Sequence, residues 1–268
     1  MTELLVDIGA NLTHDSFDDD RDQVIERASD AGITRIVVTG TNGESSRDAV
    51  ALAHSRPGTL YATAGMHPHH ASDYSDAARD TFAELIEDDT VVAVGECGLD
   101  YFRNFSSHED QLSAFDSQLE LAVQSKLPVF LHQRDAHDDF VAVLKPVMKD
   151  ISGGVAHCFT GDRDALQEYL AMGLHIGITG WICDERRGGT LCEIVADIPL
   201  DRLMIETDSP YLLPRTLDPK PKTRRNEPAY LTEVLRVIAE AMRETETTVA
   251  QATTANAERF FGLSPSPS

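Results

Sequence analysis

Acidic side chains and histidines stand at the ends of several apolar runs in this sequence. The run 91–100 reads VVAVGECGLD and carries two carboxylates, Glu96 and Asp100, after four apolar residues. Residues two or four apart share one face of an extended chain, so Glu96, Gly98 and Asp100 should point the same way. Because an unpaired carboxylate is costly to bury, this run predicts a cation beside Glu96.

Polar residues at the ends of later apolar runs could be the other ligands of such a cation. The ligand set that we favour has two carboxylates and two imidazoles: Glu96, His132, His157 and Asp208. Mixed nitrogen and oxygen ligands suit Zn²⁺, Mn²⁺ or Fe²⁺, whereas Mg²⁺ usually prefers oxygen. A metal ion there would lower the pKa of its water and polarise an ester or phosphoryl oxygen, and Asp208 could also accept a proton from that water. Alternatively, each polar group caps the next helix or pairs with a neighbour.

Strand-like and helix-like segments alternate along the chain and would bring these residues together. Strands are expected over 4–11, 35–41, 60–67, 91–100, 128–134, 154–159, 175–182 and 203–208. Helices are expected over 18–31, 45–54, 77–87, 109–126, 136–149, 163–172, 189–196, 230–244 and 247–261. Eight such units predict an α/β fold, the TIM (β/α)₈ barrel, in which catalytic residues lie at the carboxyl ends of the strands. A doubly wound open sheet is the alternative, and the absence of a GxGxxG turn disfavours it.

Length and composition limit the class of protein. The 268 residues approach the roughly 250 of one barrel, so we expect a single hydrolase domain over 1–263 and a disordered tail over 264–268. A net charge of −22 excludes a protein that coats nucleic acid with its whole surface, but not a nucleic-acid active site. We also expect a cytoplasmic protein with no membrane contact and no obligate protein partner. No apolar run is long enough for a membrane span, no secretion signal is evident, and the four cysteines form no CxxC pair.

Basic residues are concentrated near the ends of the predicted strands. Arg134 ends the fifth strand, and Arg225 belongs to a basic stretch, KPKTRR, after the eighth. Arginine binds phosphate through two hydrogen bonds, so we interpret these residues as an anion site. Pairing with nearby acids is the alternative, and for Arg225, close to Glu227, the two interpretations are equally well supported. Trp181 could stack on a nucleobase or cover the barrel mouth.

Six motifs together resemble the TatD-type metal-dependent deoxyribonucleases, and more narrowly the TatD subgroup proper. They are GMHPH at 65–69, GECGLD at 95–100, PVFLH at 128–132, HCFTG at 157–161, IETDSP at 205–210 and RNEP at 225–228. The resemblance implies an amidohydrolase-like TIM barrel that hydrolyses phosphodiesters. It further implies a 3′→5′ exonuclease on single-stranded DNA or RNA, in DNA repair or nucleic-acid turnover.

The resemblance also implies roles for individual residues. Glu96, His132, His157 and Asp208 would be metal ligands, with Glu96 and Asp208 also catalytic, and His67 would contact phosphate. Mg²⁺ is the implied metal, and Mn²⁺ or Zn²⁺ are alternatives because of the two imidazoles. Many relatives carry Asp-x-His-x-His near their N-terminus where this chain has DIGAN at 7–11. We therefore expect one firmly bound ion and a second, bridged by Glu96, that binds with substrate.

Two other functions are compatible with the same residues. A barrel of this kind could cleave a carboxylic ester, lactone or amide, because the fold alone does not determine the substrate. The basic segments favour phosphate over these substrates. A non-catalytic barrel that binds nucleic acid or protein is disfavoured by the intact set of predicted ligands.

Overall fold

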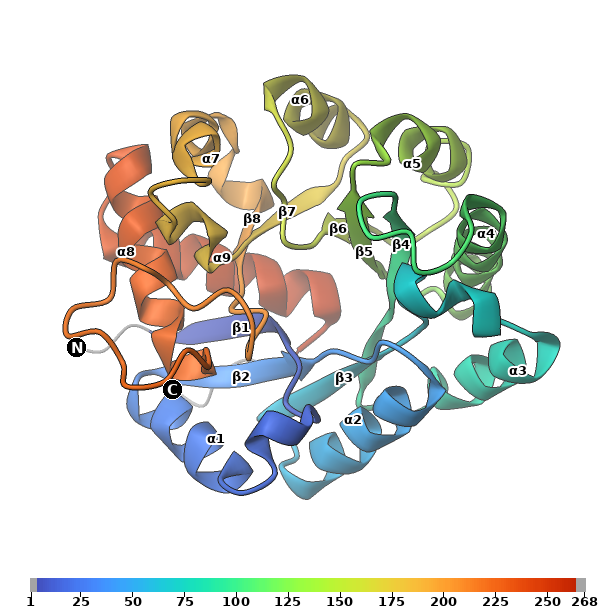
Figure 1. The fold of residues 1–268 in the computed structure, drawn as a ribbon, viewed down its shortest axis with the longest axis horizontal. Coiled ribbons are helices and arrows are strands. Elements are labelled where there is room, and N and C mark those ends of the chain that lie inside the picture. Colours follow the sequence, from blue (N-terminus) through green and yellow to red (C-terminus); the bar gives the residue numbers. More distant parts are fainter. Residues whose placement is uncertain (1–3, 264–268) are drawn as a thin grey trace. The chain divides into compact units, whose positions relative to one another are not determined.

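The computed structural model describes residues 4–263, in which strands and helices alternate in the predicted order (Figure 1). The strands are β1 (Leu5–Ala10), β2 (Ile33–Val38), β3 (Leu60–Ala64), β4 (Val91–Asp100), β5 (Val129–Arg134), β6 (Gly154–Ala156), β7 (His175–Ile178) and β8 (Leu203–Ile205). The α-helices are α1 (Arg21–Asp30), α2 (Gly43–Ser55), α3 (Asp76–Leu85), α4 (His108–Ser125), α5 (His137–Leu144), α6 (Arg163–Ala171), α7 (Gly189–Ile194), α8 (Leu231–Met242) and α9 (Glu246–Phe261). The tail predicted over 264–268 lies outside the described residues.

The strands form one eight-stranded parallel sheet in the order of the sequence, from β1 to β8. A parallel bridge between Ala10 and Ser209 joins the end of β1 to the segment after β8. The sheet therefore closes into a barrel, which confirms the predicted TIM barrel, and the open doubly wound sheet is wrong. Among residues 4–263, no helix has both the length and the apolarity that crossing a membrane requires.

The described chain divides into two compact units. The first, called the β3–β6 unit, comprises residues 38–157 and 171–174; the second, called the β7–β1 unit, comprises residues 4–37, 158–170 and 175–263. In the β3–β6 unit, α2 packs against β3 and α4 against β4 (Figure 1). In the β7–β1 unit, α9 packs against β1 and β8. The single domain predicted over 1–263 stays a prediction.

Strand β4 is buried along its whole length, as expected for a parallel strand covered on both faces. Polar side chains define the ends of the helices around it. Asn42 Oδ1 accepts the backbone N–H groups of Glu44 and Ser45 at the start of α2, and Ser107 Oγ accepts the N–H of Asp110 at the start of α4. Each cap uses a backbone donor that the helix itself leaves without a partner.

Five strands, β2, β3, β6, β7 and β8, end three or four residues earlier than the sequence predicted. Two residues in the overpredicted stretches, Cys158 and Asp208, have left-handed φ angles of 46° and 53°, which no extended strand accommodates. The polar residues at these positions therefore lie in the segments that follow the strands. Alternation along a strand therefore does not determine the directions of Cys158 and Asp208.

Strand β4 carries a bulge at the residue where the sequence predicted a ligand. The register with β5 shifts between Gly95 and Cys97, so Glu96 is an extra residue, and its N–H donates to Gly40 O at 2.8 Å instead. Gly98 pairs with His132 at φ +142°, and a Cβ on Gly98 would collide with the His132 carbonyl oxygen. Glycine at 98 therefore allows β5 to approach closely enough to bring His132 beside Glu96.

We predict that Gly98→Ala lowers the free energy of unfolding by about 3 kcal/mol or more, at the upper end of single-substitution effects. The methyl group must displace the β5 backbone in a conformation that alanine rarely adopts. Gly189→Ala is the matched control, because a Cβ on that helical glycine meets nothing within 4 Å. The control should match or slightly exceed wild-type stability in urea denaturation. Equal midpoints for wild type and Gly98→Ala would show that the close approach is not required.

Candidate metal centre

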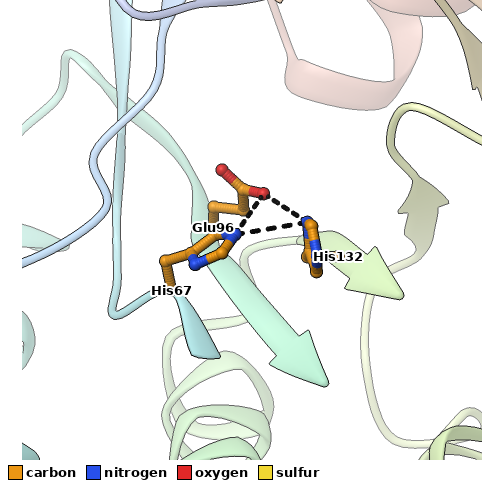
Figure 2. Close-up of side chains that lie close together, drawn as sticks. All are labelled: His67, Glu96 and His132. Carbon is orange, nitrogen blue, oxygen red and sulfur yellow. Dashed lines mark hydrogen bonds and ion pairs between the residues drawn. The ribbon is translucent and has the colours of Figure 1, made fainter. Parts of the chain in front are cut away.

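Three polar side chains of the β3–β6 unit point toward one another (Figure 2). His67 follows β3, Glu96 lies at the bulge of β4, and His132 lies in β5. His67 Nε2 is 3.4 Å from Glu96 Oε1 and 3.3 Å from His132 Nδ1, and His132 Nδ1 is 2.9 Å from Glu96 Oε1. Neighbouring strands of one parallel sheet thus bring these side chains together at one end.

A third imidazole, from the segment after β6, reaches the same carboxylate. His157 Nε2 lies 3.3 Å from Glu96 Oε1. Glu96 and His157 are both buried, with 4% and 6% of their surface exposed. One buried carboxylate oxygen therefore lies within 3.4 Å of three ring nitrogens, which come from His67, His132 and His157.

The spacing of these atoms suits a divalent metal ion. An ion about 2.1 Å from each ligand leaves neighbouring ligand atoms roughly 3 to 3.4 Å apart. His132 Nδ1 and His157 Nε2 lie 2.9 Å and 3.3 Å from Glu96 Oε1, close to that range. Imidazole nitrogen with carboxylate oxygen is a donor set for Zn²⁺, Mn²⁺ or Fe²⁺.

The contacts of each imidazole indicate which of its nitrogens carries the proton, and so whether the ring can bind a metal ion or donate a hydrogen bond. His67 Nδ1 accepts the backbone N–H of His69 at 3.1 Å, so a neutral His67 carries its proton on Nε2 and donates from there. His132 has the opposite arrangement, because its Nε2 faces Asp100 Oδ2 at 3.4 Å. His132 Nδ1 donates to the Glu96 carboxylate at 2.9 Å, and loss of that proton would free a lone pair in the same direction. With a proton on Nε2, His132 could offer Nδ1 to an ion, whereas His67 Nε2 is a hydrogen-bond donor.

The protonation states suit this division. Burial would raise the pKa of the Glu96 carboxyl, but the three imidazoles outweigh burial and lower it well below its usual range. Burial lowers the pKa of His67 well below its ordinary value, so the ring is neutral. Burial opposes a charge on His132 too, but the carboxylates of Asp100 and Glu96 prevail and raise its pKa. An ion that binds His132 Nδ1 must therefore displace a proton.

Asp100 positions the His132 ring from the side away from Glu96. The Asp100 carboxylate faces His132 through Oδ2, and the same oxygen lies 2.8 Å from His69 Nε2. Its other oxygen accepts the backbone N–H of Arg103 at 2.8 Å. Burial would raise the pKa of Asp100, but these contacts outweigh it and lower the pKa far below its usual range. A carboxylate behind a ligating histidine fixes the ring and makes it a better ligand.

The predicted ligand Asp208 belongs to the β7–β1 unit, directly after β8. Its Oδ1 accepts a hydrogen bond from Asn11 Nδ2 at 3.0 Å, and its N–H donates to Gly9 O at 2.8 Å. The neighbouring Thr207 donates from its backbone and from its hydroxyl to Asp7. Burial raises the pKa of Asp7 to about 7 despite these hydrogen bonds. Residues of β1 and the position after it thus fix the segment that carries Asp208.

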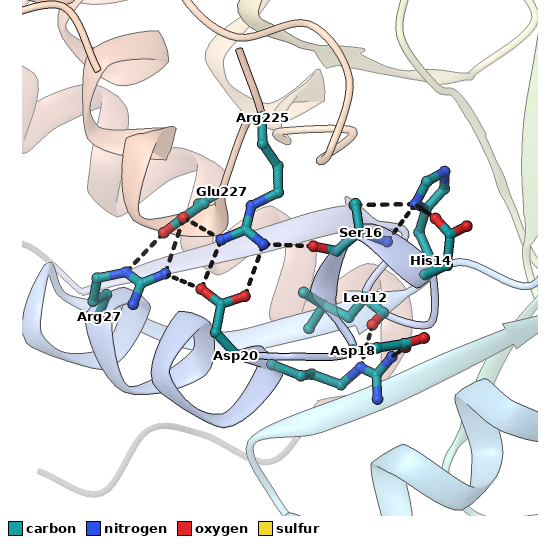
Figure 3. Close-up of polar contacts among 10 residues, drawn as sticks. Leu12, His14, Ser16, Asp18, Asp20, Arg27, Arg225 and Glu227 are labelled. Atoms are coloured by element: carbon teal, nitrogen blue, oxygen red, sulfur yellow. Dashed lines mark hydrogen bonds and ion pairs between the residues drawn. The ribbon is translucent and has the colours of Figure 1, made fainter. Parts of the chain in front are cut away.

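Arg225 is engaged by acids of its own unit (Figure 3). Its Nη1 and Nη2 donate to the two oxygens of Asp20, both at 2.7 Å, and Nη2 also donates to Glu227 at 2.9 Å. Arg27 binds the other side of Glu227, with Nε 2.8 Å from Oε2. The hydrogen bond from Arg225 is the main cause of the low pKa of Asp20, about 2. Arg225 thus pairs with acids, the alternative that the sequence left open: with the nearby Glu227 and also with Asp20, far away in the sequence.

Arg134 lies at the end of β5, in the unit that holds Glu96 and His132. Its Cζ is 5.1 Å from the centre of the Phe102 ring, and its Nε is 3.7 Å from Asp135 Oδ1. Trp181 belongs to the other unit, where the guanidinium of Arg187 lies 4.2 Å from the centre of its ring. Trp181 therefore already has a stacking partner of its own.

The sequence did not reveal the roles of His69 and Asp100. Both were visible as polar residues next to predicted ligands, with Asp100 four positions after Glu96 and His69 two after His67. Only the paired strands reveal that Asp100 meets both His69 and His132. Spacing within one segment could not have distinguished these partners from a helix cap.

Comparisons with known proteins agree on one family. A model of the family described as TatD related DNase matches residues 6–262. A protein named 3′-5′ ssDNA/RNA exonuclease TatD from Erwinia billingiae is 52% identical over 259 residues, 97% of this chain and 99% of the relative. A relative of the same name from a Pantoea species is 51% identical, over 97% of this chain and all of its own.

Solved structures agree with this result. YJJV, a TatD homologue from Escherichia coli K12, is 31% identical with a TM-score of 0.89, over 98% of this chain and 100% of its own. A TatD family hydrolase from Entamoeba histolytica is 27% identical with a TM-score of 0.88, over the same shares. The barrel, the cluster around Glu96 and a family match over nearly the whole chain lead to one classification. This chain belongs to the TatD-related DNase family.

Proposed function

We propose that this protein is a metal-dependent phosphodiester hydrolase that degrades single-stranded DNA or RNA from the 3′ end. The observation that carries the proposal is Glu96 Oε1, buried within 3.4 Å of three imidazole nitrogens. Relatives about half identical to this chain are named 3′-5′ ssDNA/RNA exonucleases, which supports the choice of substrate.

The proposed ligands are Glu96, His132, His157 and Asp208. A divalent ion there would activate water and polarise a phosphoryl oxygen. Asp208 would accept the proton of the attacking water. His67, with its donor Nε2 near the centre, would bind a phosphate oxygen of the substrate, and Asp100 would keep His132 in place.

We propose Mg²⁺ as the working metal, with Mn²⁺ or Zn²⁺ able to bind. Two imidazoles favour the latter two ions for affinity, so the proposal for Mg²⁺ rests on the family resemblance alone. We further propose one firm site and a second ion that arrives with substrate and shares Glu96. The chain has Gly9 and Asn11 where many relatives have ligating histidines, which supports the weaker second site.

We also propose that residues 1–263 work as one domain, in the cytoplasm, in DNA repair or nucleic-acid turnover and without an obligate protein partner. A family model that spans both compact units supports the single domain. The four cysteines are free thiols, as expected in a reducing compartment.

Arg134 is a better candidate for phosphate binding than Arg225. Arg134 lies in the same unit as Glu96, whereas the Arg225 guanidinium is bound on both sides by Asp20 and Glu227. Binding of a phosphate by Arg225 would require breaking these charge-assisted hydrogen bonds. We therefore assign phosphate binding to Arg134 and His67, and a scaffold role to Arg225.

If Glu96 is a metal ligand, Glu96→Gln should lose both metal binding and catalytic activity. The amide keeps the size of the side chain but removes its charge, so kcat/KM should fall by more than the roughly 10- to 100-fold caused by losing an outer partner of a ligand. Calorimetric titration with Mn²⁺ should register the loss of binding independently of turnover. Glu240→Gln, at an exposed position, is the matched control and should behave as wild type. Tight Mn²⁺ binding by Glu96→Gln would show that Glu96 is not a ligand of the ion.

The proposed polarity predicts dependence on a free 3′ end. A 5′-labelled single strand should shorten stepwise, releasing mononucleotides, while a closed single-stranded circle of the same composition persists. A strand blocked at its 5′ end serves as the control and should be degraded at the rate of the free strand. Cleavage of the circle at a similar rate would contradict the exonuclease assignment.

Substitutions at Arg134 and Arg225 should have different effects, the first on substrate binding and the second on stability. Arg134→Gln should raise KM for a single-stranded oligonucleotide and reduce the slope of log KM against log salt by about 0.7, one phosphate contact. Arg225→Gln should leave KM near wild type and lower the free energy of unfolding by about 1 kcal/mol, because its half-buried ion pairs with Asp20 and Glu227 are lost. The reverse pattern would show that Arg225 binds the phosphate.

A further inference from the structure

The loop after β4 exposes two phenylalanines beside the candidate metal centre. This loop, residues 101–107, reads YFRNFSS. Phe102 is 55% exposed and Phe105 is 67% exposed, although phenylalanine is among the residues most often buried. Two such side chains a few residues apart require an explanation other than packing.

Hydrogen bonds fix both ends of the loop. The N–H of Arg103 donates to Asp100 Oδ1 at 2.8 Å near its start. Near its end, Gln111 Nε2 donates to Ser106 O at 3.0 Å, and Ser106 Oγ donates to His69 O at 3.1 Å. The loop therefore presents its aromatic rings from a defined backbone, with less conformational entropy to lose on binding than a flexible segment.

The exposed ring of Phe105 is the outer member of a series of rings that leads to the metal centre. Its centroid lies 4.8 Å from that of His69, and the His69 centroid lies 4.2 Å from that of His67. His67 Nε2 in turn lies 3.4 Å from Glu96 Oε1. Two histidine rings thus connect the exposed face of Phe105 to the centre.

Positive charge accompanies the second aromatic ring. The guanidinium carbons of Arg103 and Arg134 lie 5.4 Å and 5.1 Å from the centre of the Phe102 ring. Both distances are within the range of cation–π attraction. The chain as a whole has a net charge of −22, so two arginines beside an exposed aromatic ring give this loop a positive charge that differs from the acidic character of the chain. Aromatic faces combined with arginines are the usual means of binding a single strand without reading its sequence.

We propose that loop 101–107 is the nucleobase platform of this protein. Phe105 stacks on a base near the 3′ end of a single strand, and Arg103 and Arg134, placed by Phe102, bind the adjoining phosphates. The proposal rests on the proposed function and explains a preference for single strands. A base in a duplex is already stacked and paired, so its face is not available to Phe105.

The test compares Phe105→Ala with wild type on two oligonucleotides. One is oligothymidylate, and the other carries abasic residues in place of its 3′-terminal thymidines. On oligothymidylate, Phe105→Ala should raise KM about five- to a hundredfold, the usual effect of losing one base–aromatic stack. On the abasic strand, wild type should show the same rise and Phe105→Ala no further rise, because both changes remove the same contact.

Two more variants serve as controls. Phe105→Trp should restore the wild-type KM, since indole also stacks on a base. Leu4→Ala removes an apolar side chain that is 46% exposed in the other unit, and KM should not change. Should Phe105→Ala fail to fold, the comparison of thymidine with abasic strands on the wild-type protein still decides the question.

The outcomes separate the platform from the function on which it rests. Wild-type turnover with equal KM values for thymidine and abasic strands overturns the platform and leaves the exonuclease proposal standing. A wild-type protein that degrades no oligonucleotide overturns both. A loss of self-association in Phe105→Ala, measured by sedimentation with KM unchanged, would identify the aromatic patch as a protein interface and overturn the platform.

Discussion

The structure depends on one buried carboxylate, Glu96, and on the three imidazoles around it. An isolated carboxylate is expensive to bury, and here three rings from three other segments balance it. The bulge in β4 directs Glu96 to that position, and the missing side chain of Gly98 allows His132 to reach it. An ion held among these groups would take over the balancing role of the ring protons.

Strand β4 carries a second residue, besides Glu96, that organises the site. Asp100, at its carboxyl end, fixes His132 and His69 and accepts the backbone N–H of Arg103. The same carboxylate thus couples the geometry of a proposed ligand to the loop that exposes Phe105. A substitution at Asp100 would disturb both metal binding and substrate binding, which makes it less informative than a change at either place alone.

Local patterns predicted the barrel and much of the centre. The run 91–100 is a strand with the predicted bounds. A parallel strand that is buried on both faces is a nearly continuous apolar run, and such a run is visible in the sequence. Glu96, His132 and His157 meet as expected, because strand ends of one sheet converge. The early ends of β6 and β8 were missed, because left-handed φ angles at Cys158 and Asp208 leave no clear mark in the sequence.

Contacts between distant segments limited the rest of the prediction. Arg225 pairs with Asp20, 205 positions away, so no local pattern could choose between pairing and phosphate binding. The proton on His67 Nε2 follows from a backbone N–H on Nδ1, which only coordinates reveal. The bulge at Glu96 was likewise invisible, because the sequence predicted simple alternation along β4.

Anomalous scattering from Mn²⁺ in crystals of the wild-type protein would locate the proposed ion directly. We expect a peak about 2.1 to 2.3 Å from Glu96 Oε1, His132 Nδ1 and His157 Nε2, with Asp208 as a further ligand. His67 Nε2 should not ligate that ion, since it carries a proton. A protein that degrades oligonucleotides with Mn²⁺ and yet shows no peak at Glu96 would show that Glu96 does not hold the catalytic ion.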